Sequence, residues 1–148
     1  MPPVFVFIRH SHRLGEALSD HGRASVQHTA QWLTAQRYLP DLVLTTDTLR
    51  TRETATLLMR QTGRTMARLL AQRSLFGTLD GLRSHTREGA ARQPTGVVWF
   101  VGHHPSEACL QRVLGAALAI PPDNRCAAVA FERDGDDFRM LAWFAGSA

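Results

Sequence analysis

The chain has 148 residues, 44% hydrophobic and 20% charged, which are the proportions of one soluble globular domain with a sizeable core. Its formal net charge of +4 comes from arginines alone, and no run of them is typical of nucleic-acid binding. No apolar run approaches the roughly 20 residues that span a bilayer, and no basic segment precedes the first apolar run as in a signal peptide. We expect one domain over residues 1–148, a cytoplasmic location, and no nucleic-acid or membrane partner.

The two cysteines, Cys109 and Cys126, are widely spaced and form no CxxC pattern. Such a pair is typical of buried thiols in a reducing compartment, and it indicates neither a redox site nor a zinc site.

The first predicted element is a strand over residues 4–8, where five apolar residues follow one another. Such a run indicates a strand that is buried on both faces. It stops at Arg9 and His10, which therefore lie at the carboxyl end of the strand, where open α/β sheets bind their ligands. A polar connection over residues 13–18 follows.

The next predicted elements alternate between helices and strands. Ser19 can cap a helix that runs to about Tyr38, with Val26, Ala30 and Leu33 on its inner face. A strand follows over residues 42–46. Asp47 can then cap a helix from Thr48 to about Thr62, which Gly63 ends.

The second half of the chain repeats this alternation. A short strand is possible within residues 66–75, and the later predicted elements are a helix over 79–93, a buried strand over 97–101, a helix that begins near Pro105, and a hairpin of strands 127–132 and 138–144. This order predicts an α/β protein, a three-layer α/β/α sandwich with a mixed, mostly parallel central sheet.

Three of the buried strands end in residues that suit an anion. Arg9 and His10 end the first, Thr46 ends the second with Arg50 one helical turn later, and His103 follows the third. If these strands are neighbours, two arginines and two histidines meet at one edge of the sheet. Arginine offers a planar fork of donors for phosphate, and histidine can act as a nucleophile.

Four segments, taken in order, resemble the motifs of the histidine phosphatase superfamily, also called phosphoglycerate mutase-like. Residues 9–11 resemble its Arg-His-Gly signature, 18–22 its Leu-Thr-x-x-Gly segment, 46–55 its Ser-Pro-x-x-Arg-x-x-x-Thr-Ala segment, and 101–103 its Val-Gly-His segment. The short length of the chain resembles the bacterial phosphohistidine phosphatases of the SixA type.

The resemblance implies a phosphatase that forms a covalent phosphohistidine without a metal or another cofactor. His10 is the implied nucleophile, and Arg9, Arg50 and His103 are the implied catalytic phosphate ligands, with Ser11 also at the phosphate. The residues expected at the rim of the pocket are His12, Arg13, Glu16, Thr46 and His104.

Two positions depart from the motifs of the family. Ser11 stands in place of glycine, which permits closer backbone approach, and we expect it to be tolerated. Larger members carry a glutamate acid where this chain has Ser74, and the nearest alternative acids are Asp80, Glu16 and Asp20. Because the imidazole of a phosphohistidine leaves more easily than an alkoxide, a missing acid favours an N–P substrate.

Three functions remain open at this point. The first is a phosphohistidine phosphatase acting on a phosphorylated carrier or phosphotransfer protein, with a phosphomonoesterase for small molecules as its variant. The second is a phosphate- or phosphoprotein-binding module of low activity. The third is a metal hydrolase, because His12 lies two residues after His10 and His103 precedes His104. The oligomeric state stays open.

Overall fold

The computed structural model describes residues 3–15, 17–72, 79–103, 125–135 and 137–146. The described strands and helices, in chain order, are β1 (Val4–Arg9), β2 (Arg13–Leu14), β3 (Ala17–Leu18), α1 (Asp20–Gln36), β4 (Leu42–Thr46), α2 (Leu49–Gln61), β5 (Arg68–Gln72), α3 (Leu79–Arg92), β6 (Val97–Gly102), β7 (Ala128–Asp134) and β8 (Asp137–Phe144).

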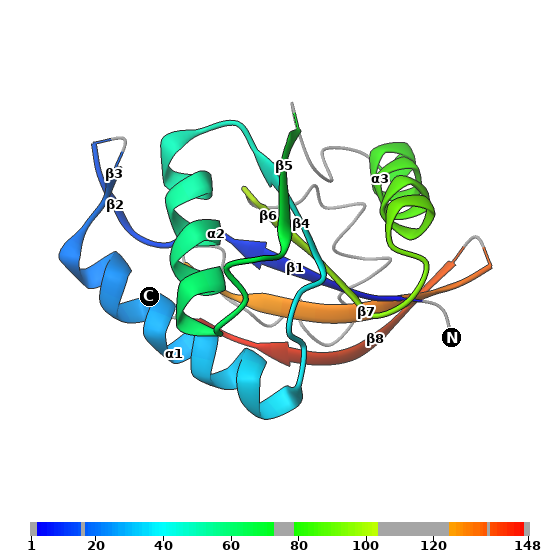
Figure 1. The fold of residues 1–148 in the computed structure, drawn as a ribbon. Coiled ribbons are helices and arrows are strands. Elements are labelled where there is room, and N and C mark those ends of the chain that lie inside the picture. The colour runs from blue at the N-terminus through cyan, green and yellow to red at the C-terminus, as the bar shows by residue number, and fades with distance from the viewer. Residues whose placement is uncertain (1–2, 16, 73–78, 104–124, 136, 147–148) are drawn as a thin grey trace.

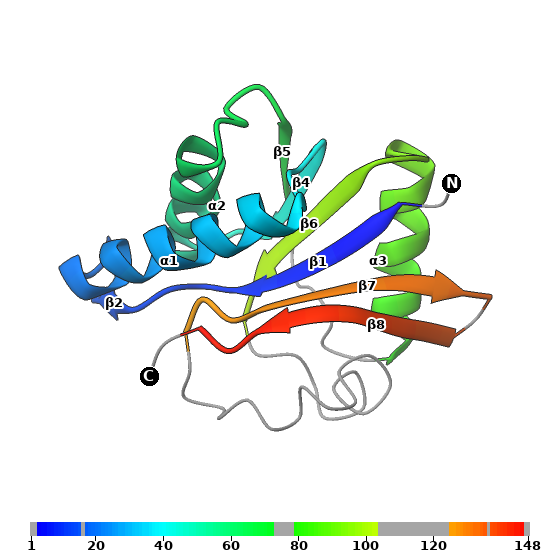
Figure 2. The same ribbon diagram turned by 90° about the horizontal axis from the view of Figure 1, so that it is seen from below.

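The central sheet has six strands in the order β5-β4-β6-β1-β7-β8. The pairs β5–β4, β4–β6 and β6–β1 are parallel, and β1–β7 and β7–β8 are antiparallel. Figure 2 shows β1 between β6 and β7, with neighbours on both sides. This position explains the unbroken apolar run of β1, because both faces of the strand are covered.

Helices cover both faces of the sheet, and the alternation of β1 side chains divides the core between them. Phe5 and Phe7 pack in one cluster with Leu82 of α3, whereas Val6 and Ile8 pack in another with the buried faces of α1 and α2. Figure 1 accordingly shows α1 and α2 together and α3 apart from them across the sheet. The predicted three-layer sandwich with a mixed, mostly parallel sheet is confirmed.

The two predicted helix caps have different outcomes. The Ser19 hydroxyl accepts a hydrogen bond from the Gly22 N–H and starts α1 as predicted. The helix ends at Gln36 and not at Tyr38, because Arg37 adopts a left-handed conformation (φ 62°). The Tyr38 N–H then turns back to donate to the Leu33 carbonyl.

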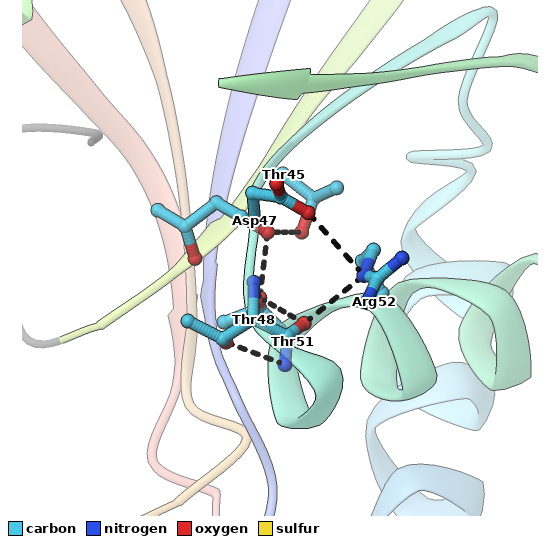
Figure 3. A network of polar contacts seen from close by, with 6 residues as sticks. Thr45, Asp47, Thr48, Thr51 and Arg52 are labelled. Atoms are coloured by element: carbon cyan, nitrogen blue, oxygen red, sulfur yellow. Dashed lines mark hydrogen bonds and ion pairs between the residues drawn. The ribbon is translucent and has the colours of Figure 1, made fainter. Parts of the chain in front are cut away.

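The start of α2 corrects a prediction. The cap is Thr48 and not Asp47, because Thr48 and Thr51 form a reciprocal capping box in which each side chain accepts from the backbone N–H of the other. Figure 3 shows these bonds between Thr48 and Thr51 at the start of the helix.

The remaining expectations divide into confirmed, missed and undescribed elements. The short strand within residues 66–75 forms as β5, and the C-terminal hairpin forms as β7 and β8. The polar connection after β1 contains a small antiparallel pair, β2 and β3, that the sequence analysis did not predict. The helix expected near Pro105 lies outside the described residues.

No helix in the described ranges is both long and apolar enough to cross a membrane.

Candidate active site

The register of the sheet brings the two predicted histidine segments together. In the parallel ladder Arg9 stands opposite Gly102, and the His10 N–H continues the ladder by donating to the Gly102 carbonyl at 2.9 Å. His103 follows Gly102 directly. The rings of His10 and His103 consequently lie edge to face with their centroids 5.3 Å apart.

The ring of His10 is held in one tautomer. Its Nδ1 lies 2.9 Å from the carbonyl oxygen of Ser11, which can only accept, so Nδ1 carries the proton. In the neutral ring Nε2 then has the free electron pair. The side chain is only 6% exposed, and the strand that precedes it is rigidly paired on both sides. These facts describe an oriented, unprotonated nitrogen at the edge of the sheet.

The environment of His10 keeps this ring neutral. Burial is the largest cause that lowers its pKa, to about 4, and electrostatic repulsion from His103, Arg9 and Arg50, which disfavours a proton on His10, acts in the same direction. The hydrogen bond to Ser11 opposes them without cancelling them. The ring is therefore unprotonated near neutral pH, the state that a nucleophile requires.

Arg50 belongs to the first turn of α2, which begins one short connection after β4. The Thr51 hydroxyl donates to the Thr46 carbonyl at 2.7 Å and so ties this turn to the end of the strand. In Figure 3, Arg52 lies on the outer side of the junction, between Asp47 and the Thr48 carbonyl, and it is exposed. Arg50 lies two residues earlier in the same helix. Its charge acts on both His10 and His103.

His103 experiences the same cationic surroundings. Burial lowers its pKa first, followed by the charges of Arg50, Arg9 and Arg13. The Nε atoms of Arg9 and Arg50 are both buried. Two half-buried arginines and two neutral imidazoles thus meet beyond the ends of β1, β6 and β4, an arrangement that suits a tetrahedral oxyanion.

Ser11 is bound to the protein on every side. Its N–H donates to the Thr54 hydroxyl at 3.0 Å, its hydroxyl donates to the Gly22 carbonyl at 2.7 Å, and its carbonyl holds His10. The side chain has no exposed surface. The structure thus gives Ser11 a structural role, and its expected contact with phosphate stays a prediction that this arrangement does not favour.

The predicted rim residues have different outcomes. The His12 ring lies against His21 at a centroid distance of 4.2 Å, and Arg13 lies in β2, exposed but close enough for its charge to act on His103. Thr46 ends β4, and its buried Oγ1 has no hydrogen-bond partner among the described residues. Glu16 and His104 lie outside the described residues.

The charges that act on the two histidines come from arginine and histidine side chains. Of the candidate acids, Asp80 is exposed and pairs loosely with Arg83 at 3.9 Å, and Asp20 is exposed in the first turn of α1. Ser74 is outside the described residues. Within the described part of the chain, no three His, Cys, Asp or Glu side chains form a group that could hold a metal ion.

Sequence reasoning missed three residues that support the site. Gly22 and Thr54 fall inside quoted motifs but received no role, and Cys126 was expected only to be buried. Cys126 is buried with its pKa raised to about 11 by that burial, and its N–H donates to the His10 carbonyl. The motif positions of Gly22 and Thr54 were a signal that could have been followed, and nothing in the sequence pointed to Cys126.

No family model and no curated protein sequence matches the chain. Solved structures do. A candidate phosphohistidine phosphatase, SixA, from Agrobacterium tumefaciens has a TM-score of 0.73 and 22% identity, covering 98% of this chain and 99% of that one. The protein histidine phosphatase SixA complexed with tungstate has a TM-score of 0.72 and 14% identity, covering 97% and 96%.

A phosphoglycerate mutase from Bacillus anthracis str. Sterne has a TM-score of 0.66 and 12% identity, covering 95% of this chain and 92% of its own. The chain is thus similar to these proteins over nearly its whole length. It has the phosphoglycerate mutase-like α/β fold that was expected from the sequence.

Proposed function

We propose that the chain is a metal-independent phosphatase that forms a covalent phosphohistidine on His10. The observation that carries the proposal is the ring of His10, which presents Nε2 inside a cluster formed by Arg9, Arg50 and His103. The similarity to the protein histidine phosphatase SixA, whose structure contains tungstate, supports the same assignment.

In the first step the Nε2 electron pair attacks phosphorus and the bond to the leaving group breaks. The ring remains protonated on Nδ1, so it becomes cationic as the new bond forms, and the Ser11 carbonyl stabilises that charge. Arg9 and Arg50 bind the phosphoryl oxygens, over which the negative charge of the transition state is spread.

In the second step water attacks phosphorus, the N–P bond breaks, and inorganic phosphate leaves with the electron pair returned to Nε2. The lowered pKa of His103 leaves its ring unprotonated, so it can accept a hydrogen bond from the water or donate one to a phosphoryl oxygen. The cycle consumes one water and needs no metal.

The proposed substrate is a phosphohistidine in a carrier or phosphotransfer protein. The charged groups that act on His10 and His103 are arginines, and no carboxyl group is among them. The described site therefore offers a leaving group no carboxylic acid that would protonate it. An imidazole needs less protonation on departure than an alkoxide does. A small phosphomonoester with a good leaving group, such as an aryl phosphate, should react by the same route.

The test compares turnover of a phosphohistidine protein and an aryl phosphate by the wild type, His10→Ala and His28→Ala, with and without a chelator. His28 is an exposed histidine on α1 and serves as the matched control. We expect His10→Ala to lose at least ~10³-fold in kcat, with His28→Ala and chelation without effect.

Three results would contradict the proposal. Vanadate binding without turnover of either substrate would make the chain a phosphate-binding module. Loss of activity on chelation would indicate a metal hydrolase. Equal activity of His10→Ala and wild type would remove His10 from the chemistry.

A further inference from the structure

Thr54 joins the two segments that carry the opposing parts of the site. Its hydroxyl accepts from the Ser11 N–H at 3.0 Å, in the loop of His10, and donates to the Arg50 carbonyl at 2.8 Å. The residue has no exposed surface. One buried oxygen atom therefore links the nucleophile loop to the turn that carries the arginine.

The other side of the loop is fixed to the start of α1. The Ser11 hydroxyl donates to the Gly22 carbonyl, and the Ser19 N–H donates to the His12 carbonyl at 2.9 Å. The Ser11 carbonyl, between these bonds, holds Nδ1 of His10. Any shift of Ser11 would move the ring of the nucleophile with it.

Thr86 is a buried threonine whose hydroxyl bonds only within its own helix, and it serves as a comparison for Thr54. The Thr86 hydroxyl in α3 donates to the Leu82 carbonyl at 2.9 Å, four residues earlier, just as Thr54 donates to Arg50. Thr86 is equally buried but lies on the opposite face of the sheet. Thr54 differs because it also accepts from an amide of another segment, which would be left buried without that bond if the hydroxyl were removed.

We propose that Thr54 is a positioning residue that sets the place of His10 relative to Arg50, and that the Ser11 hydroxyl fixes the same loop against α1. The inference rests on the proposed function for its kinetic consequence. It also assigns a purpose to the serine that replaces glycine in the signature: the hydroxyl ties the loop to a backbone carbonyl that a glycine could not reach.

The test uses two substitutions that separate the hydroxyl of Thr54 from its methyl group. Thr54→Ser keeps the hydroxyl, and Thr54→Val keeps the volume but removes both hydrogen bonds. Because displacements of about 1 Å can cost about 100-fold in rate, we expect Thr54→Val to lower kcat by roughly 10- to 100-fold while KM changes less than about threefold. Thr54→Ser should retain kcat within about threefold.

Thr86→Val and Thr86→Ser are the matched controls for the loss of a buried hydroxyl. Thr86→Val should lower the melting temperature less than Thr54→Val does, because only Thr54→Val leaves the Ser11 N–H without its acceptor, and both Thr86 variants should leave kcat unchanged. If Thr54→Val fails to fold, Ser11→Ala replaces it, since that change removes the hydroxyl and its bonds to the Gly22 carbonyl and the Cys126 thiol but keeps the Ser11 N–H, and we expect a 3- to 10-fold fall in kcat. A folded Thr54→Val or Ser11→Ala with the kcat of Thr86→Val would overturn the inference.

A spectroscopic readout separates this inference from the proposed function. The Nδ1 proton of His10 is observed by NMR with ¹⁵N-labelled histidine, which needs no turnover. Wild type, Thr54→Ser and Thr86→Val should share one protected Nδ1–H signal, and Thr54→Val should shift or lose it. An unchanged signal in Thr54→Val would reject the inference, whereas a shifted signal in a protein without phosphatase activity would reject only the function.

Discussion

At the scale of single residues, the chemistry depends on which nitrogen of His10 carries the proton. The Ser11 carbonyl decides this by accepting from Nδ1, and burial among positive charges removes the second proton. Both effects come from the surroundings of the ring. A histidine side chain free in solution would exchange between its two tautomers and would titrate near pH 6.5.

The lowered pKa of His10 makes stability depend on pH. The pKa is about 4 in the folded chain against 6.5 for the ordinary side chain, so the unfolded chain binds more protons between these values. The contribution of His10 is therefore fully present above pH 6.5 and is lost as the pH falls towards 4. In phosphate-free buffer, the urea midpoint of the wild type should fall over this window more steeply than that of His10→Asn.

His85 and His103 also have lowered pKa values, and they remain in both proteins. The difference between the two curves therefore isolates His10. Parallel curves for wild type and His10→Asn would contradict the assigned environment.

At the scale of elements, the site depends on how closely α1 approaches the loop after β1. A Cβ added at Gly22 would lie 2.0 Å from the carbonyl oxygen of His12, a backbone atom that cannot rotate away. The glycine of the 18–22 segment is thus explained by contact distance. The hydroxyl bond from Ser11 to Gly22 uses the same approach.

Gly22→Ala should therefore destabilise the chain by about 1–3 kcal/mol or more, measured by urea denaturation, and should lower kcat because the loop must move. Gly89→Ala in α3 is the matched control, since its Cβ would meet only side-chain atoms at 3.4 Å. Alanine there should be neutral or stabilise by up to about 1 kcal/mol. Equal effects of the two substitutions would show that the close contact at Gly22 has no consequence.

Sequence patterns predicted those elements whose signal is local and strong. The buried strands β1 and β6 hold continuous apolar runs, β4 is an apolar run that ends in two threonines, and the residues at these ends, Arg9 and His103 among them, could be named before the structure. The two-residue strands β2 and β3 could not, because so short a pair has no periodicity. Thr48 was missed as the cap because Asp47 suits that position equally well by residue type.

At the scale of the whole molecule, the sheet order places three strand ends side by side, and the charges of Arg9 and Arg50 act on both histidines at that edge. The sequence could propose the convergence of Arg9, Arg50 and His103 only on the condition that their strands were neighbours. The order β4-β6-β1 supplies that condition. The bonds around Ser11 could not be predicted, because they join residues up to 43 positions apart.

A tetrahedral oxyanion should accordingly stabilise the fold. At a tungstate concentration 100 times its Kd, mass action adds about 2.7 kcal/mol, which raises the melting temperature of a chain of this size by roughly 5–11 °C. Arg50→Gln should abolish most of this rise. Arg87→Gln, which removes an exposed arginine from α3, should leave it intact. The same rise in both variants would place the anion elsewhere.

The covalent intermediate provides the most direct measurement of the central claim. Wild type and His10→Asn are mixed with a labelled phosphohistidine protein or aryl phosphate, quenched rapidly in base, and digested for peptide mapping by mass spectrometry. We predict a base-stable, acid-labile phosphoryl group on His10 of the wild type and none on the variant. Label on another residue, or equal label on both proteins, would contradict the account.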